Sequence, residues 1–185
     1  MKRDSERIYD EFLVAAAITG DRPALQRLVA RWQPRLWRHA WRVLGDADRA
    51  KDMVQEAWIE IVKSISRLDD VAAFPAWAFR IVTRRCHRAF AGADRSITMA
   101  DVSEVEQYLE NPAEPTAESA VDVSLVLDAI GRLPAAQRAA MALFYIEDLS
   151  VAEIAIATDV PPGTVKTRLL HARRKVRAIL EGDDS

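Results

Sequence analysis

The sequence lacks most of what a disulfide-bonded, hairpin-rich or membrane-spanning protein needs. Its 185 residues include one cysteine, Cys86, so an internal disulfide is excluded. Asn-Gly and Asp-Gly pairs, the commonest tight hairpin turns, are absent. No apolar run approaches roughly 18 residues, so we expect no membrane insertion. The first residues, MKRDSERIYDEF, carry acids and no apolar signal core, and we expect a cytoplasmic protein.

What is present favours a helical and globular chain. Half of the residues are hydrophobic and 29% are charged, which is too apolar a mixture for a disordered protein. Alanine, leucine, arginine and glutamate, which favour helices, are abundant. The length suits one large or two small domains that fold without a metal or a disulfide. We therefore predict an all-α protein.

The formal net charge of −2 disfavours nucleic-acid binding only if it is evenly spread. The segment from Asp94 to Asp128, however, contains nine acidic residues and one basic residue, Arg95. Its net charge is therefore −8, and the remainder of the chain has a net charge of +6. The acidic segment contains two Xaa-Pro pairs and has little periodicity. We predict two small helical domains, 1–91 and 121–185, joined by an acidic flexible linker over 92–120. Its acids are expected to reduce non-specific binding of the free protein to DNA phosphates.

Apolar residues recur at helical spacing up to residue 90, and proline, glycine and capping residues predict the helix ends. Pro34 is expected to end a helix, and Asp46 to begin the longest one. The expected helices run from Ser5 to Gly20, from Asp21 to Pro34, from Leu36 to Leu44, from Asp46 to Ile65 and, after a break at Ser66 to Val71, from Phe74 to Phe90.

The C-terminal part has the pattern of a helix-turn-helix. Ser150 and Glu153 have the spacing of a capping box, which begins a first helix. The residues Val160 to Val165, VPPGTV, predict a tight turn, because two prolines suit a helix entry but not its interior. The second helix, from Lys166 to Arg177, carries six cations and no acid. A solvated basic face on an ordinary bundle is the alternative, but it does not explain the cap and the turn together.

In a helix-turn-helix the second helix enters the major groove with its first turns. Early exposed positions then contact base edges, and flanking cations and hydroxyls contact phosphates. The residues predicted to contact bases are Lys166, Thr167, Leu170 and His171, and those predicted to contact phosphates are Thr164, Arg168, Arg173 and Arg174.

Three segments, taken together, resemble an extracytoplasmic-function (ECF) sigma factor of the sigma-70 family, a small two-domain bacterial transcription initiation factor. These segments are DMVQEAW at Asp52 to Trp58, FPAWAFRI at Phe74 to Ile81, and Leu149 through Arg174. The resemblance covers nearly the whole chain. It implies that 1–91 is sigma region 2, which binds core RNA polymerase and the minus-10 element, and that 121–185 is region 4, which binds minus-35 duplex.

The resemblance also implies roles for individual residues. The polymerase contact falls on Asp52, Gln55 and Glu56, and the minus-10 strand contact falls on Trp77, Phe79, Arg80, Arg84 and Arg88. Because Trp77 is in step with the apolar stripe of its helix, we interpret it as packing, and Phe79, off that stripe, is the preferred base contact. Residues 64–73 match the loop that receives a flipped base. The resemblance further implies control by an anti-sigma factor.

Several positions depart from the family pattern. Arg84 stands where Asn is frequent, His171 where Arg is frequent, and Asp69-Asp70 occupies the flipped-base loop. Thr158-Asp159 replaces the usual Leu-Gly before the turn, which requires Asp159 to adopt a left-handed backbone conformation. These departures leave the promoter sequence undetermined.

Two other functional classes fit less well. An enzyme needs converging reactive groups, but the three histidines are scattered, and Cys86-His87 lacks the second ligand pair of a zinc site. We expect no catalytic residue, metal, cofactor or small-molecule substrate, and we interpret Cys86 as a buried apolar residue. A helix-turn-helix regulator with an N-terminal effector or dimerisation domain is the second alternative. Such a regulator does not need the helices carrying Asp52 to Glu56 and Phe74 to Ile81.

Overall fold

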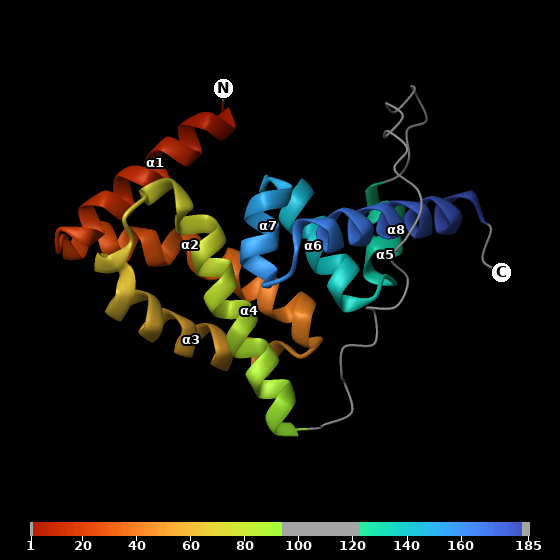
Figure 1. Ribbon diagram of the computed structural model, residues 1–185, viewed down its shortest axis with the longest axis horizontal. Coiled ribbons are helices and arrows are strands. Elements are labelled where there is room, and N and C mark those ends of the chain that lie inside the picture. Colours follow the sequence, from red (N-terminus) through yellow and green to blue (C-terminus); the bar gives the residue numbers. More distant parts are fainter. Residues whose placement is uncertain (1, 94–122, 183–185) are drawn as a thin grey trace.

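The structure is a computed structural model that describes residues 2–93 and 123–182, and every element within those ranges is a helix (Figure 1). Almost all of the predicted linker lies outside the described residues. The elements, in chain order, are α1 (Lys2–Ile18), α2 (Arg22–Leu44), α3 (Ala47–Ser64), the short 3-10 helices η1 (Ile65–Arg67) and η2 (Val71–Ala73), α4 (Phe74–Ala93), α5 (Val123–Gly131), α6 (Ala135–Tyr145), α7 (Val151–Thr158) and α8 (Pro162–Glu181).

The N-terminal half, α1 to α4, packs around buried aromatic side chains. Trp32 of α2 is fully buried, with its ring edge-on to Phe74 at 5.0 Å between centroids and 5.8 Å from Phe79. Helix α2 contacts α1, α3 and α4, and its buried positions Leu28, Trp32 and Leu36 follow a four-residue spacing. The predicted amphipathic pattern is therefore the one that builds this core.

Helix α2 continues through Pro34, so the predicted break at that residue is wrong. An interior proline removes one helical hydrogen bond and costs about 3 kcal/mol. Leu28 and Trp32 before it and Leu36 and Ala40 after it all face the same core and are all buried. Each of the large side chains gains about 1.5–3 kcal/mol on burial, which outweighs the cost of the proline.

Several other predicted helix boundaries are confirmed, whereas α1 begins at Lys2 and not at the predicted Ser5. Gly45 ends α2 with a left-handed backbone, φ 72°, and Asp46 caps α3. The Asp46 carboxylate accepts hydrogen bonds from the backbone N–H groups of Asp48 and Arg49, each at 3.0 Å. Helix α4 begins at Phe74, as expected. The predicted break before it contains η1 and η2, which connect α3 to α4.

The C-terminal half, α5 to α8, is a second small bundle in which α8 contacts α5, α6 and α7. Its buried side chains include Leu133, Leu143, Ile154, Val165 and Leu169. The described residues thus form the two helical units that the sequence predicted.

The two halves lie against one another (Figure 1). Helix α7 packs along α4, and α6 packs against α2. The buried residues of both halves form one continuous cluster, whereas the sequence predicted two separate domains joined by a flexible linker. A polar contact also crosses between them, because Arg138 Nη2 donates to the backbone carbonyl of Arg42 at 2.9 Å.

Candidate nucleic-acid and protein interfaces

A reciprocal capping box fixes the start of α7. The Ser150 hydroxyl accepts from the Glu153 backbone N–H at 3.2 Å, and the Glu153 carboxylate accepts from the Ser150 backbone N–H at 2.8 Å. Burial by itself would raise the pKa of Glu153, but the bonds with Ser150 and the nearby Arg7 hold that pKa below its usual range. Helix α7 ends at Thr158, its C-terminal cap Asp159 has a left-handed φ of 58°, and α8 begins at Pro162. The predicted capping box, turn and left-handed Asp159 are confirmed.

Helix α8 buries one face and leaves the opposite face accessible. Val165, Leu169 and Ala172 are buried against the rest of the C-terminal half. All eight residues predicted to contact minus-35 DNA lie outside that buried stripe. Lys166, Thr167, Arg173 and Arg174 are exposed, and Thr164, Arg168, Leu170 and His171 are half-buried. Between Pro162 and Ile179 the helix has no acidic side chain, so this face is electropositive.

One side chain outside the predicted set supports Arg173. The Nε atom of Arg173 donates to the Tyr145 hydroxyl at 2.8 Å. The same guanidinium lies 5.7 Å from the centre of the Tyr145 ring and 5.6 Å from that of Phe144. Tyr145 is exposed at the end of α6. The sequence carried no signal for this pair, because its members lie 28 positions apart on different helices.

Helix α4 presents Arg84 and Arg88 as exposed side chains and Arg80 and Trp77 as half-buried ones. Phe79, the preferred base contact in the sequence analysis, is fully buried. Its ring packs against Trp32 and lies 5.1 Å from the His39 ring. The expectation for Phe79 is therefore wrong, because α4 is covered on two sides and a position off one apolar stripe still faces the core.

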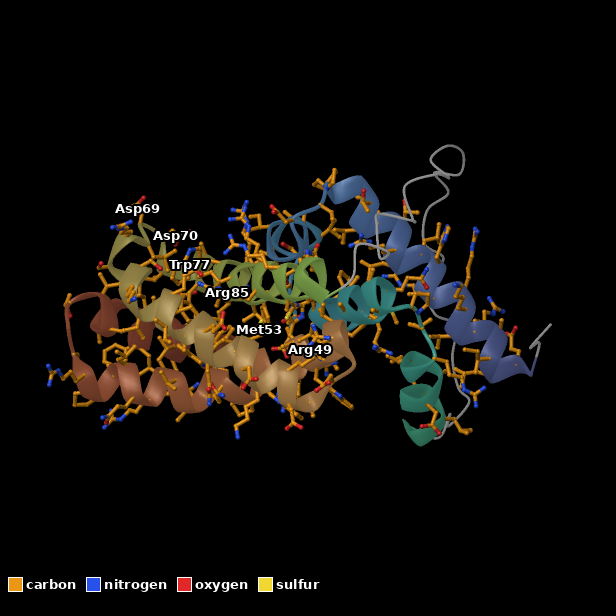
Figure 2. The ribbon with its side chains drawn as sticks, turned by 90° about the horizontal axis from the view of Figure 1, so that it is seen from below. Arg49, Met53, Asp69, Asp70, Trp77 and Arg85 are labelled. Carbon is orange, nitrogen blue, oxygen red and sulfur yellow. The ribbon has the colours of Figure 1, made fainter. Side chains whose placement is uncertain are left out.

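Trp77 remains accessible and adjoins the loop before α4. Its ring lies 6.0 Å from that of Phe74, so it packs on the core with one part of its surface. Figure 2 shows Trp77 beside Asp69 and Asp70. The Asp70 carboxylate accepts from the backbone N–H of Ala72 at 2.9 Å and thereby caps η2, while Asp69 is exposed. Of the two aromatic candidates on α4, Trp77 is the one that a base could reach.

The outer face of α3 holds the predicted polymerase contact. Asp52, Gln55 and Glu56 are all exposed on it. Two residues that were not predicted from the sequence, Ile59 and Val62, continue the same stripe and are 57% and 45% exposed. Large apolar residues exposed at helical spacing next to acids are typical of a protein interface.

Glu56 already has a partner within the chain. Arg85 of α4 donates to Glu56 at 2.9 Å through Nη1 and to Glu60 at 3.0 Å through Nε. These bonds raise the pKa of Arg85 above its ordinary value. The pair holds the Glu56 carboxylate in place on the α3 face.

The turn of the helix-turn-helix lies against α4. Asp159 accepts a hydrogen bond from Arg80 Nη2 at 2.9 Å and from Arg84 Nε and Nη2 at 3.3 Å each. The Arg80 guanidinium, with Arg84 beside it, holds the pKa of the Asp159 carboxyl below its usual range. Arg80 and Arg84, both predicted to contact DNA, thus bind a residue of the C-terminal half that lies 79 and 75 positions further along the chain.

The described residues contain no group of three or more His, Cys, Asp or Glu side chains placed to hold a metal ion. Cys86 is fully buried, as predicted, and burial raises the pKa of its thiol to about 12. Burial also lowers the pKa of His87, and the nearby Arg168 lowers it further. Among the helices of 2–93 and 123–182, none is long and apolar enough to cross a membrane.

Two protein-family models match the two halves. Sigma-70 region 2 matches residues 28–96, and Sigma-70 region 4 matches residues 124–176, so the matches together cover about two thirds of the chain. Similar curated proteins include the RNA polymerase sigma-H factor of Pseudomonas aeruginosa, 29% identical, and the ECF RNA polymerase sigma-E factor of Escherichia coli, 28% identical. Each alignment spans 182 residues and covers 93% of this chain and 94% of the relative.

Two solved structures share the fold. CnrH, in its complex with the cytosolic domain of CnrY, has a TM-score of 0.63 at 24% identity and covers 96% of this chain and 99% of its own. The sigma factor RpoE of Bartonella quintana, in complex with the anti-sigma factor NepR, has a TM-score of 0.62 at 22% identity and covers 85% of this chain and 96% of its own.

Proposed function

This chain belongs to the ECF class of the sigma-70 family, and we propose that its two halves divide promoter recognition between them. Residues 1–91 bind core RNA polymerase and the minus-10 element, and residues 121–185 bind the minus-35 element. The observation that carries this proposal is the pairing, in one chain, of an accessible cationic face on α8 with an acidic and apolar face on α3. DNA phosphates attract the first face, whereas the second suits a basic protein surface.

On α8 the proposed role of each residue depends on its position along the helix and on its charge. Lys166, Thr167, Leu170 and His171 are placed on the early turns, where a recognition helix meets base edges. Arg173, Arg174, Arg168 and Thr164 flank them and suit the phosphates on either side. Tyr145 positions Arg173 through its hydroxyl, so we add it to the phosphate-binding side of this surface as a positioning residue.

On α4 the proposed minus-10 contacts are Trp77, Arg80, Arg84 and Arg88. Strand opening requires a replacement for base stacking, and an accessible aromatic face supplies about 1–3 kcal/mol per stacked base. Trp77 is the accessible aromatic side chain beside the loop at 64–73, and the three arginines follow it along the helix at intervals of three or four residues. Those intervals place them on a common side of α4, where they can follow a phosphate backbone.

Sigma factors are non-enzymatic initiation factors, and we propose that this chain acts in the cytoplasm with RNA polymerase and has no catalytic site of its own. An anti-sigma factor is its proposed regulator. Support for that partner comes from the similar fold of RpoE, whose structure is a complex with the anti-sigma factor NepR.

The test is reconstitution with core RNA polymerase. The intact protein is expected to bind core polymerase and start transcription from promoters selected out of a random DNA library. A triple variant, Asp52→Ala/Gln55→Ala/Glu56→Ala, is expected to lose polymerase binding while it keeps its fold. The matched control, Glu6→Ala/Gln26→Ala/Asp128→Ala, also removes two acids and one amide from exposed positions, and it should bind normally. Failure of the intact protein to bind core polymerase contradicts the proposal, and equal binding by the two variants removes the α3 trio from the contact.

A further inference from the structure

Arg80 and Arg84 serve two roles that exclude one another. Each is proposed above to contact the minus-10 strand, yet in this structure both bind the carboxylate of Asp159. Oδ1 of Asp159 accepts a hydrogen bond from Arg80, and Oδ2 accepts from Arg84. A carboxylate bridging two guanidinium groups offers the same charge and the same paired oxygens as a DNA phosphate. A guanidinium held in this way has fewer donors left for a phosphate.

We propose that Asp159 competes with the phosphates of the promoter strand for Arg80 and Arg84, and so holds the helix-turn-helix against α4 when DNA is absent. This inference rests on the proposed role of α4. Asp159 lies at the turn between α7 and α8, and α7 is the element that packs along α4. Release of Asp159 therefore frees the cations of α4 and removes one of the contacts that hold the helix-turn-helix beside it.

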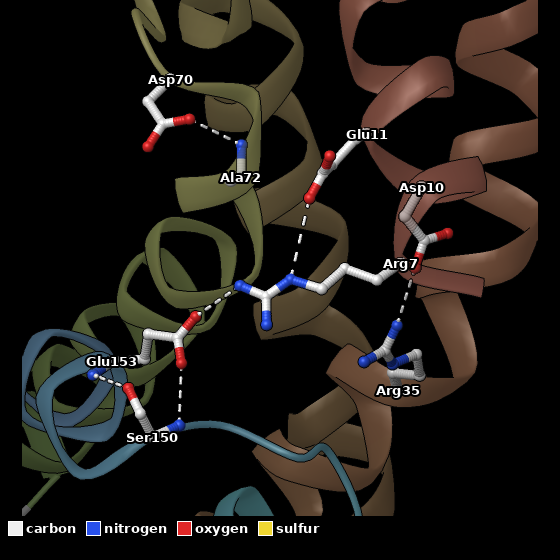
Figure 3. A network of polar contacts seen from close by, with 8 residues as sticks. All are labelled: Arg7, Asp10, Glu11, Arg35, Asp70, Ala72, Ser150 and Glu153. Carbon is white, nitrogen blue, oxygen red and sulfur yellow. Dashed lines mark hydrogen bonds and ion pairs between the residues drawn. The ribbon is translucent and has the colours of Figure 1, made fainter. Parts of the chain in front are cut away.

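A second contact, again between a cation of the N-terminal half and an acid of α7, lies at the opposite end of α7. Arg7 of α1 donates to Glu153 at 3.1 Å, and Glu153 is also the acid of the capping box (Figure 3). Arg7 is oriented by Glu11, one turn along α1, at 3.7 Å. Both ends of α7 are thus tied to the N-terminal half, and each time the cation comes from that half and the acid from α7 or its cap.

A third contact secures the loop before α7. Arg35 of α2 donates to Glu147 at 2.6 Å through Nε and to Asp10 at 3.2 Å through Nη1. Glu147 is buried, which distinguishes this pair from the more accessible pairs of Glu153 and Asp159. Ion pairs of one polarity at three places make the association of the halves electrostatic in part, so added salt is expected to weaken it.

The exposed position of Asp159 makes its contact reversible. Asp159, Arg80 and Arg84 have side chains that are 45%, 38% and 47% exposed, so water can replace either partner when the contact breaks. Exposed pairs of this kind contribute little individually. A nucleic-acid strand with several phosphates can therefore displace one carboxylate.

The backbone conformation at Asp159 permits a substitution that removes the charge without disturbing the turn. Its φ of 58° is left-handed, a conformation that asparagine adopts at least as readily as aspartate. Asp159→Asn thus removes the charge and keeps the turn. Glu181→Gln is the matched control, because it also removes one acid from the C-terminal half, and its partner is Arg177 on the same helix.

The first experiment measures the association of the halves in the full-length protein. Fluorophores are placed on cysteines introduced at Lys51 and Lys175, both exposed, and the buried native Cys86 does not compete for the label. At roughly 50 mM salt, Asp159→Asn is expected to lower energy transfer relative to the unsubstituted protein, and Glu181→Gln is expected to leave it unchanged. Equal energy transfer in the two variants overturns the inference.

The second experiment measures DNA binding by the free protein. The probe is a single-stranded DNA of mixed sequence and roughly 12 nucleotides, because phosphate contacts are independent of sequence. Asp159→Asn is expected to bind at least about threefold more tightly than Glu181→Gln. Adding Arg80→Ala and Arg84→Ala to Asp159→Asn should remove that gain. A gain that survives the loss of both arginines, or no gain over Glu181→Gln, overturns the inference.

These results are distinguishable from a failure of the proposed function. If the reconstituted polymerase starts transcription but Asp159→Asn changes neither energy transfer nor DNA binding, the inference is wrong and the proposed function stands. If no transcription occurs, the proposed function is wrong, and the energy-transfer measurement still decides whether Asp159 holds the two halves together.

Discussion

His39 Nε2 lies 2.8 Å from Thr83 Oγ1 in the interior of the N-terminal half. The Thr83 hydroxyl donates its only proton to the backbone carbonyl of Phe79, at 2.9 Å. His39 must therefore donate through Nε2, which leaves Nδ1 unprotonated, and Nδ1 is buried with no hydrogen-bond partner among the described residues. Burial first, and then the nearby charges of Arg42 and His87, lower the pKa of His39 to about 3.

This buried imidazole predicts a loss of stability in mild acid. The ordinary pKa of histidine is 6.5 and that of folded His39 is about 3, so between these values the unfolded chain binds a proton that the folded chain does not. Stability therefore falls as the pH drops below about 6.5, by about 2 kcal/mol at pH 5, if each pH unit contributes about 1.4 kcal/mol.

The measurement is urea unfolding at neutral pH and near pH 5, for the unsubstituted protein and for His39→Gln. Glutamine keeps a donor for Thr83 and has no titrating group. The loss of stability between the two pH values should be smaller in His39→Gln by about 2 kcal/mol. An equal loss in both proteins would remove His39 as its source.

Alanine substitutions at Trp77 and Phe79 are expected to affect different properties of the protein. Phe79 is fully buried, so Phe79→Ala should lower the free energy of unfolding by about 3–5 kcal/mol. Trp77 is half-buried, so Trp77→Ala should cost less stability but reduce strand opening by the polymerase complex. Urea unfolding measures the first effect, and a fluorescent base analogue in the minus-10 element measures the second. Normal opening by a folded Trp77→Ala would exclude Trp77 as a base contact.

Tyr145→Phe is expected to weaken binding to minus-35 duplex by about two- to tenfold, the range of one hydrogen bond. The substitution removes the hydroxyl that orients Arg173 and keeps the ring beneath its guanidinium. In an Arg173→Ala background the same change should have no further effect, because the pair acts as a unit. Fluorescence anisotropy provides the affinities, and Tyr9→Phe on α1 is the control. Additive losses would show that Tyr145 acts independently of Arg173.

His171→Arg is expected to change the preferred minus-35 sequence and leave the minus-10 preference as it is. His171 lies outside the buried stripe of α8, on the turns that we propose contact base edges, and an arginine can bind guanine there through two hydrogen bonds. Promoters selected from a random library by each reconstituted polymerase provide the comparison. An unchanged minus-35 preference would remove His171 from the residues that read bases.

The sequence predicted local structure well wherever short-range chemistry decides it. The Asp46 cap, the left-handed Gly45 and the Ser150–Glu153 capping box each depend on residues within three positions of one another. Pro34 shows the limit of such rules, because burial of Trp32 and Leu36 on either side keeps α2 continuous. Phe79 shows the same limit, since helical periodicity reveals one buried face and not a second.

The sequence by itself determined the helical class, the two units, the helix-turn-helix and the family, because these depend on periodicity, caps and motifs that are local in the chain. Only the tertiary structure decided that the halves share one buried cluster and that Asp159 forms ion pairs with Arg80 and Arg84. Contacts across 75 or more positions depend on how two finished surfaces fit, and charge complementarity between them is not visible until both are folded.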